Sequence, residues 1–439
     1  MTRFIAILVL LLFSFESFAS SAKIQNVETK LNTNIWLIED NSLPIISFKI
    51  AFRHAGSAYE PIGKSGTSNL LSNMLNKGAG KYSNLELKKI LEDNAIYINF
   101  TLDKDNLYAN LSTLKENKDK AFEILSLMLT KPLFDKKTFI RVKSQALDSV
   151  KKKMEKPNYI ADLRWIEESF AGHQYGLPTR GYPETIENIT IDDLKKFMNE
   201  HISLSNAVMS IVGNISKSET TSLFNQYLSK LPVTPVEAKK TDCPGIAYIR
   251  QLPEGRTIHI KKDIPQSVVI FGTNGISYAD KDFYAAHIMN YILGGGGFES
   301  RLMNEIREKR GLAYSVYSFL TTMSYTSLLK GGLGTRNEKL DEALDVLKAE
   351  FKKMQKNGIT SDELNSAKSY LTGSFHIHLD SNQKLVDFIS FIQLEELGID
   401  FMAKRNNYIN KVSLEDVNRV AKRLLNPEDL IITIVGKKL

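Results

Sequence analysis

Part of this 439-residue sequence occurs twice, in the same order and at a nearly constant separation. The segment 189–213 begins ITIDDL and ends MSIVG, and it matches the segment 412–436, which begins VSLEDV and ends ITIVG, without a gap between the blocks. A shorter block, 142–147, matches 367–372 at almost the same offset. Because three matching blocks in one order argue against chance, the pattern predicts two homologous halves of about 210 residues each.

The two halves are separated by a stretch whose prolines would interrupt any helix or central strand, namely Pro232, Pro235 and Pro244. We therefore expect an N-terminal domain over 23–231, a linker over 232–245 and a C-terminal domain over 246–439. The composition, with 43% hydrophobic and 24% charged residues, is that of a globular protein. It excludes collagen-like, mucin-like and wholly disordered chains.

The segment 1–22 reads as an export signal. Arg3 precedes an apolar run over 4–13, and small residues then offer cleavage after Ala19 or Ala22, which is the layout of a secretory signal peptide. An uncut N-terminal anchor is the alternative, although the run is short for a membrane span. No other stretch reaches about 18 uninterrupted apolar residues, so we expect an exported chain without integral membrane association.

The cysteine content and the charge narrow the possible compartments and partners. The single cysteine, Cys243, excludes a disulfide framework and a cysteine zinc cluster. It fits a bacterial periplasm, where unpaired thiols risk oxidation. The net charge of +7 is modest for this length and the lysines are scattered among acids, so we expect no nucleic-acid partner.

Alternating apolar residues predict β-hairpins, and apolar residues at helical spacing predict packed helices. The stretch 96–111 alternates on both sides of a polar turn, and 315–335 reads as a second hairpin. Helical stripes occur over 122–129 and 340–347. Because strands and helices do not alternate regularly, the predicted fold class is α+β, with an antiparallel-rich sheet packed by helices in each half.

The segment 66–78, GTSNLLSNMLNKG, resembles the inverted zinc helix of the M16 peptidases, a family that includes pitrilysin-like enzymes and the mitochondrial processing peptidase. Members carry H-x-x-E-H there, because residues i and i+4 share a helix face and can hold one Zn²⁺ while the glutamate polarises a water. This chain has Asn69, Ser72 and Asn73 at those positions, and the family's third ligand falls on Ser149. The resemblance therefore implies a degenerate zinc site and no metal in this chain.

The run 293–315 contains LGGGGFESRL followed by EIREKRGLAYS, and it closely resembles the C-terminal-domain signature of the same family. The resemblance implies a substrate-recognition loop at Gly294, Gly295, Gly296 and Gly297. It also implies that Arg307 and Tyr314 support the carbonyl of a scissile peptide from the domain opposite the zinc. A fork of cationic donors and a directed O–H suit a developing oxyanion. The alternatives are a solvated helix face at Arg307 and core filling at Tyr314.

The resemblance covers nearly the whole mature chain and implies two domains of the M16 fold. Some members are dimers in which one subunit carries the zinc helix and the other carries the glycine loop and the Arg/Tyr pair. We therefore expect a non-catalytic subunit whose partner is a paralogue with an intact H-x-x-E-H motif and bound zinc, acting on a peptide substrate. The alternative is a periplasmic peptide-binding or structural homodimer without hydrolytic activity. An independent peptidase is disfavoured, since neither G-x-S-x-G nor H-E-x-x-H occurs.

Overall fold

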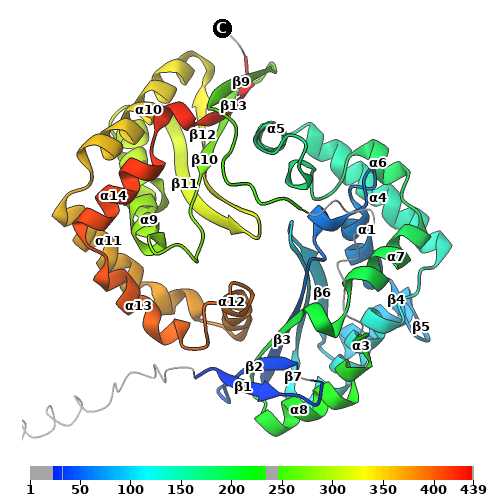
Figure 1. The fold of residues 1–439 in the computed structure, drawn as a ribbon. Coiled ribbons are helices and arrows are strands. Elements are labelled where there is room, and N and C mark those ends of the chain that lie inside the picture. The colour runs from blue at the N-terminus through cyan, green and yellow to red at the C-terminus, as the bar shows by residue number, and fades with distance from the viewer. Residues whose placement is uncertain (1–22, 32, 234–245, 438–439) are drawn as a thin grey trace, which may run out of the picture.

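The computed structural model describes residues 23–31, 33–233 and 246–437. They form two lobes that face one another, with the N-terminal half on the right of Figure 1 and the C-terminal half on the left. The expected signal peptide and all but two residues of the expected linker lie outside the described residues. Within the part of the chain that is described, no helix is long and apolar enough to cross a membrane.

The N-terminal lobe is built on a six-stranded sheet with the order β1-β2-β8-β3-β7-β6. β2 and β8 run parallel, and the other neighbours are antiparallel. The strands are β1 Gln25–Glu28, β2 Asn34–Glu39, β3 Ile45–Arg53, β6 Tyr97–Leu102, β7 Asn106–Leu114 and β8 Ala207–Gly213, with a separate small hairpin of β4 Gly78–Ala79 and β5 Tyr82–Ser83.

The C-terminal lobe repeats this arrangement in a five-stranded sheet with the order β11-β12-β10-β13-β9. Its strands are β9 Arg256–Lys261, β10 Gln266–Asn274, β11 Ala313–Met323, β12 Thr326–Arg336 and β13 Ile431–Gly436. β9 and β13 form the parallel pair, and β10, β12 and β11 follow antiparallel. They take the places of β2, β8, β3, β7 and β6. The predicted α+β fold with two homologous domains is therefore confirmed, as are the hairpins β6–β7 and β11–β12.

Helices cover both sheets. Those of the N-terminal half are α1 Thr67–Leu75, α2 Asn84–Asp93, α3 Lys118–Thr130, α4 Lys136–Met154, α5 Pro157–Ser169, α6 Pro183–Glu187, α7 Ile191–His201 and α8 Lys217–Gln226. Those of the C-terminal half are α9 Phe283–Asn290, α10 Leu340–Asn357, α11 Ser361–Gly373, α12 Asn382–Leu394, α13 Phe401–Lys411 and α14 Leu414–Leu424.

The repeated sequence folds in the same way twice because its helix-start signal is repeated. Before α7, Thr190 and Asp193 cap each other's backbone N–H groups at 3.2 and 2.7 Å. Before α14, Ser413 and Asp416 form the same reciprocal capping box at 3.1 and 3.0 Å. Each helix is followed by a strand that lies inside its sheet, β8 or β13, and β13 is buried at every position.

Each lobe also contributes one helix to the sheet of the other. α5 of the N-terminal half packs on β10 and β13, and α12 of the C-terminal half packs on β3 and β8 (Figure 1). Trp165 on α5 is fully buried, and its indole Nε1 donates to the backbone oxygen of Ile431 at 2.9 Å. The starts of the two helices, Pro157 and Asn382, are separated by the offset of the shorter sequence repeat. The packing of α5 on the C-terminal sheet and that of α12 on the N-terminal sheet are therefore equivalent contacts.

Matching ion pairs accompany the exchanged helices. Asp387 on α12 contacts Lys49 on β3 at 2.7 Å. Asp162, which precedes Asp387 by the offset of the shorter repeat, lies on α5 and pairs with Lys330 on β12. The lysine side chains are only 16% and 12% exposed, so water screens these pairs less than it screens surface pairs.

A third contact joins the lobes where the tip of the β11–β12 hairpin meets the turn between β6 and β7. The Asp105 carboxylate accepts from the backbone N–H of Ser324 at 3.0 Å and from the Tyr175 hydroxyl at 2.5 Å. The Tyr175 hydroxyl also accepts from the backbone N–H of Tyr325 at 3.3 Å. The hairpin tip thus adds a polar contact to the two helix exchanges.

Candidate functional site

Three of the four degenerate zinc-site positions line one cavity. Asn69 and Asn73 lie one turn apart on α1, and Ser149 lies on α4, which packs against α1. Their side chains line a cavity of about 150 Å³. The fold thus brings together Asn73 and Ser149, which belong to different helices and lie far apart in the sequence.

Ser72, at the glutamate position of the motif, does not line this cavity. Its side chain is buried, and its hydroxyl donates to the backbone oxygen of Asn69 at 2.8 Å. The Asn73 amide donates to the same oxygen at 2.7 Å. Both side chains thus bind back to their own helix, as serine and asparagine commonly do. A serine in this position provides no carboxylate to polarise a water.

The chemistry of the cavity does not fit a zinc ion. Beyond the three residues above, its polar lining consists of Gln145 and two cations, Lys77 and Arg180. Zinc in proteins takes cysteine, histidine or carboxylate ligands, and fixed positive charges oppose the approach of a dication. Over residues 23–31, 33–233 and 246–437, no group of three or more His, Cys, Asp or Glu side chains could hold a metal ion.

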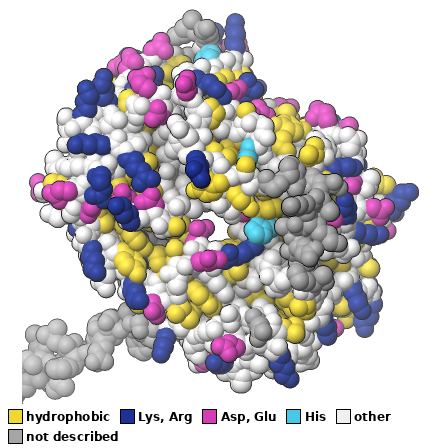
Figure 2. All heavy atoms as spheres, viewed as in Figure 1, with side chains coloured by type: hydrophobic (Ala, Val, Ile, Leu, Met, Phe, Trp, Pro, Cys, Tyr) yellow, Lys and Arg dark blue, Asp and Glu magenta, His cyan; other side chains and the backbone are white. Residues whose placement is uncertain are grey.

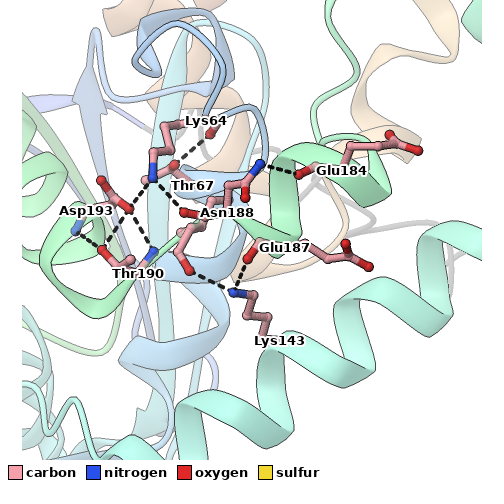
Figure 3. Close-up of polar contacts among 9 residues, drawn as sticks. Lys64, Thr67, Lys143, Glu184, Glu187, Asn188, Thr190 and Asp193 are labelled. Carbon is pink, nitrogen blue, oxygen red and sulfur yellow. Dashed lines mark hydrogen bonds and ion pairs between the residues drawn. The ribbon is translucent and has the colours of Figure 1, made fainter.

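Two lysines hold α1 and α4 in place beside this cavity (Figure 3). Lys64, which precedes α1, donates to the backbone oxygen of Asn188 at 2.6 Å and to the Asp193 carboxylate at 2.9 Å. Lys143 on α4 donates to two backbone oxygens of the segment 187–189 at 2.6 and 2.9 Å. Both helices are therefore fastened to the segment that leads into α7.

A buried carboxylate fixes the start of α1. Glu60 is 1% exposed, and it accepts from the backbone N–H groups of Gly66 and Ser68 at 2.7 and 2.8 Å and from the Ser68 hydroxyl at 2.5 Å. These contacts satisfy donors that the first helical turn cannot pair internally. Burial raises the pKa of Glu60 to about 7, although these donors oppose the shift.

Arg307 and Tyr314 are brought together by stacking. Arg307 lies in a π-helical turn, Met303–Glu308, with its guanidinium carbon 4.9 Å from the ring centroid of Tyr314 and 4.7 Å from that of Phe298. Tyr314 is 83% exposed, so it does not fill the core. Arg307 contacts Glu308 at 3.5 Å. The aromatic rings thus hold the guanidinium beside an accessible phenol.

The glycine run packs closely against β11. A Cβ at Gly294 would lie 2.5 Å from the Ser318 hydroxyl and 2.9 Å from its backbone nitrogen, so a larger residue would push the run away from the strand. Gly297 has φ +58°, which favours glycine. Phe298, the next residue, is 62% exposed and stacks on Arg307. The glycines therefore position Phe298, and their contact with a substrate backbone stays a prediction.

A cavity between the lobes was not predicted from the sequence. It has a volume of about 290 Å³, and charged groups of both signs line it, including Lys49, Arg53, Asp105 and Glu395. Burial raises the pKa of Glu395, and the neighbouring Asp105 carboxylate adds to the shift. Figure 2 shows charged and histidine side chains around the opening between the lobes. Because several separate segments form the walls, no local motif marks this cavity.

Two protein-family models match this chain. A family model described as "Insulinase (Peptidase family M16)" matches residues 47–182, and a second, described as "Peptidase M16 inactive domain", matches 188–371. The chain belongs to the M16 peptidase family. The second match runs from the segment before α7 into α11, so this M16 chain carries family sequence in both lobes.

Relatives extend the match to the ends of the chain. The "Non-peptidase homolog YmxG" of Helicobacter pylori is 28% identical over 98% of both chains. The "Uncharacterized zinc protease YmxG" of Bacillus subtilis is 26% identical over 87% of this M16 chain and 90% of its own. Among solved structures, an M16 inactive domain from Pseudomonas fluorescens aligns with a TM-score of 0.87 and 27% identity, covering 95% of this chain and 98% of its own. The expected family is therefore confirmed, while export and the partner stay predictions.

Proposed function

We propose that this chain is the non-catalytic subunit of a heterodimeric M16-type peptidase that is exported to a bacterial periplasm. One observation carries the proposal: the α1–α4 cavity offers no zinc ligand, while Arg307 is held beside an exposed Tyr314. Random mutation without selection would not be expected to remove every zinc ligand and leave Arg307 and Tyr314 in place. The name of the Helicobacter pylori relative, a non-peptidase homolog, supports the absence of independent activity.

In this proposal the chain binds the peptide and stabilises charge, and a zinc ion in the partner supplies the activated water. Arg307 presents a permanent cation with several N–H donors, and stacking on Phe298 limits its rotamers. Tyr314 presents one O–H donor to solvent. Both groups would donate to the carbonyl oxygen of the scissile peptide as it gains negative charge. A preorganised donor of this kind contributes about a hundredfold or more to kcat.

Reconstitution with a secreted paralogue that carries H-x-x-E-H tests this function. We expect the pair to hydrolyse an unfolded peptide and each chain alone to be inactive. Arg307→Ala and Tyr314→Phe should each lower kcat about a hundredfold. Assembly, measured by size-exclusion chromatography with light scattering, should be unchanged. Elemental analysis of this chain alone should find no stoichiometric zinc.

Two nearby residues provide matched controls. Arg336 lines the same surface pocket as Arg307, and Tyr317 is a half-exposed tyrosine on the same strand as Tyr314. Arg336→Ala and Tyr317→Phe should leave kcat within about twofold, since Arg336 pairs with Glu338 and Tyr317 stacks on Phe319 rather than on Arg307. Unchanged kcat in both the Arg307 and the Tyr314 variants would refute the catalytic role. A homodimer without a zinc-bearing partner would favour the alternative, a peptide-binding or structural protein.

A further inference from the structure

The C-terminal lobe contains an aromatic pocket that the proposed function does not use. It has a volume of about 560 Å³ and lies between α9, α12, α13 and the turn Phe375–Leu379. This volume is within the range of small-ligand sites, which is about 300–1,000 Å³. Seven rings form its walls, namely Tyr278, Phe283, Tyr284, Phe375, Phe388, Phe391 and Phe401.

The pocket is formed before any ligand arrives, because α12 is fixed from its other side. Val386, Ile389 and Ile392 on that side are fully buried in a cluster that includes strand residues of the N-terminal lobe. Phe388 and Phe391 therefore remain on the pocket side. Phe388 also packs on Phe375, with ring centroids 5.3 Å apart. A preformed pocket avoids the entropic cost of ordering side chains on binding.

Two of the charged groups that line the pocket are neutralised by partners. Lys384 pairs with Asp380 at 2.8 Å. Asp387 pairs with Lys49 of the other lobe at 2.7 Å. His287 also lines the pocket, and burial lowers its pKa to about 4, so it is uncharged at neutral pH. These groups leave no net charge in the pocket.

Arg405 is the exception. In the described chain it forms no ion pair, and its Nη1 donates to the backbone oxygen of Leu371 and to the Asn406 side chain, both at 3.1 Å. Its guanidinium carbon lies 4.3 Å from the ring centroid of Phe375. Burial lowers the pKa of Arg405, as expected for a cation without a nearby counter-ion. Among the described residues that line it, the pocket therefore combines apolar side chains with one positive charge that has no ion-pair partner.

We propose that this pocket binds the C-terminal residue of a peptide, with an apolar side chain among the rings and the α-carboxylate on Arg405. A guanidinium matches a carboxylate in charge and in geometry. The pocket shares Tyr278, Asp387 and Phe391 with the cavity between the lobes, so a chain lying in that cavity can end in the pocket. The choice of a peptide rests on the proposed function, whereas the preference for an apolar carboxylate rests on the pocket alone.

Calorimetric titration of the purified mature chain tests the proposal. The probes are N-acetyl-Ala-Ala-Ala-Phe as the free acid, the same peptide as its C-terminal amide, and 3-phenylpropionate. We expect the free acid to bind at least about tenfold more tightly than the amide, which is the effect of one charge-assisted hydrogen bond. This comparison uses the unaltered protein, so it does not depend on whether a variant folds.

Variants then locate the carboxylate. Arg405→Gln should weaken binding of the free acid by at least about tenfold and remove the difference between acid and amide. Lys384→Gln is the matched control, because Lys384 lines the same pocket but is already paired. It should leave both affinities within about twofold. Thermal unfolding of each variant shows whether the Leu371 and Asn406 contacts of Arg405 were needed for folding.

Equal binding of acid and amide, or no binding of the free acid at millimolar concentration, would overturn the proposal. If 3-phenylpropionate binds as tightly as the peptide, the assignment of a peptide as the ligand is overturned. The pocket is then assigned to a small apolar carboxylate. These titrations use this chain alone. A failure to reconstitute a peptidase with a paralogue would therefore refute the proposed function and leave the result on the pocket standing.

Discussion

Single residues around α1 decide whether the cavity between α1 and α4 can hold a metal ion. Asn69, Asn73 and Ser149 still line one cavity, although none of them suits zinc. Glu60 explains part of this, since it accepts three donors at the start of α1 whatever the chemistry of the cavity. The start of α1 is therefore held by a residue that does not line the cavity.

The buried Glu60 predicts a pH dependence. Its pKa rises from 4.5 to about 7 on folding, so the folded state keeps its proton more tightly than the unfolded state does. Its contribution to stability is fully present below pH 4.5 and is lost as the pH rises towards 7. We expect the free energy of unfolding of the wild type, minus that of Glu60→Gln, to fall across this window in urea titrations.

Glu86, which caps α2, is the matched control for this experiment. Its pKa is lowered by hydrogen bonds from Ser83, so its contribution is lost as the pH falls. The corresponding difference for Glu86→Gln should not fall between pH 4.5 and 7. A pH-independent difference for Glu60→Gln would show that its carboxyl group titrates normally.

At the scale of elements, the exchanged helices α5 and α12 join the two halves of the molecule. Each covers a sheet of the opposite half, and Trp165 fills the α5 contact. We expect Trp165→Ala to lower the free energy of unfolding by about 3–5 kcal/mol, since it removes a buried aromatic side chain. Chemical unfolding measures this loss. Ile140→Ala on the exposed side of α4 should change stability by less than about 0.5 kcal/mol. A similar effect of both variants would contradict the packing role.

At the scale of the whole molecule, the halves are joined by more than the covalent chain. We expect the two halves to stay together after cleavage at a protease site placed within 232–245, because α5 and α12 each bury apolar surface in the other lobe. Size-exclusion chromatography of the cleaved protein measures this. The cleaved double variant Asp162→Lys and Asp387→Lys sets like charges against Lys330 and Lys49 and should separate on dilution. Separation of the cleaved wild type would contradict the prediction.

The sequence predicts much of this architecture because the repeat carries local signals. The capping boxes at Thr190 and Ser413 define equivalent helices, and the alternating stretches become the hairpins β6–β7 and β11–β12. The family spacing paired Ser149 with Asn73, and both residues line one cavity in the structure. Their assignment to a degenerate zinc site stays a prediction.

What the sequence did not predict depends on contacts between distant segments. Periodicity can indicate that a helix has a buried face, but it does not show which sheet buries that face, as for α5 and α12. A signal was present, since Asp162 and Asp387 are separated by the repeat offset. The stack of Arg307 on Phe298 and the aromatic pocket also arise from side chains that are not neighbours along the chain. Neither has a periodic pattern.

The exchange of α5 and α12 sets an order in which the chain can fold. One face of the N-terminal sheet is covered by α12, which ends at Leu394, so that face remains uncovered until nine-tenths of the protein has been synthesised. α5 is made early and packs on β10 and β13, and β13 is the last strand of its sheet to be made. The last contacts of both lobes therefore depend on segments from the C-terminal part of the chain.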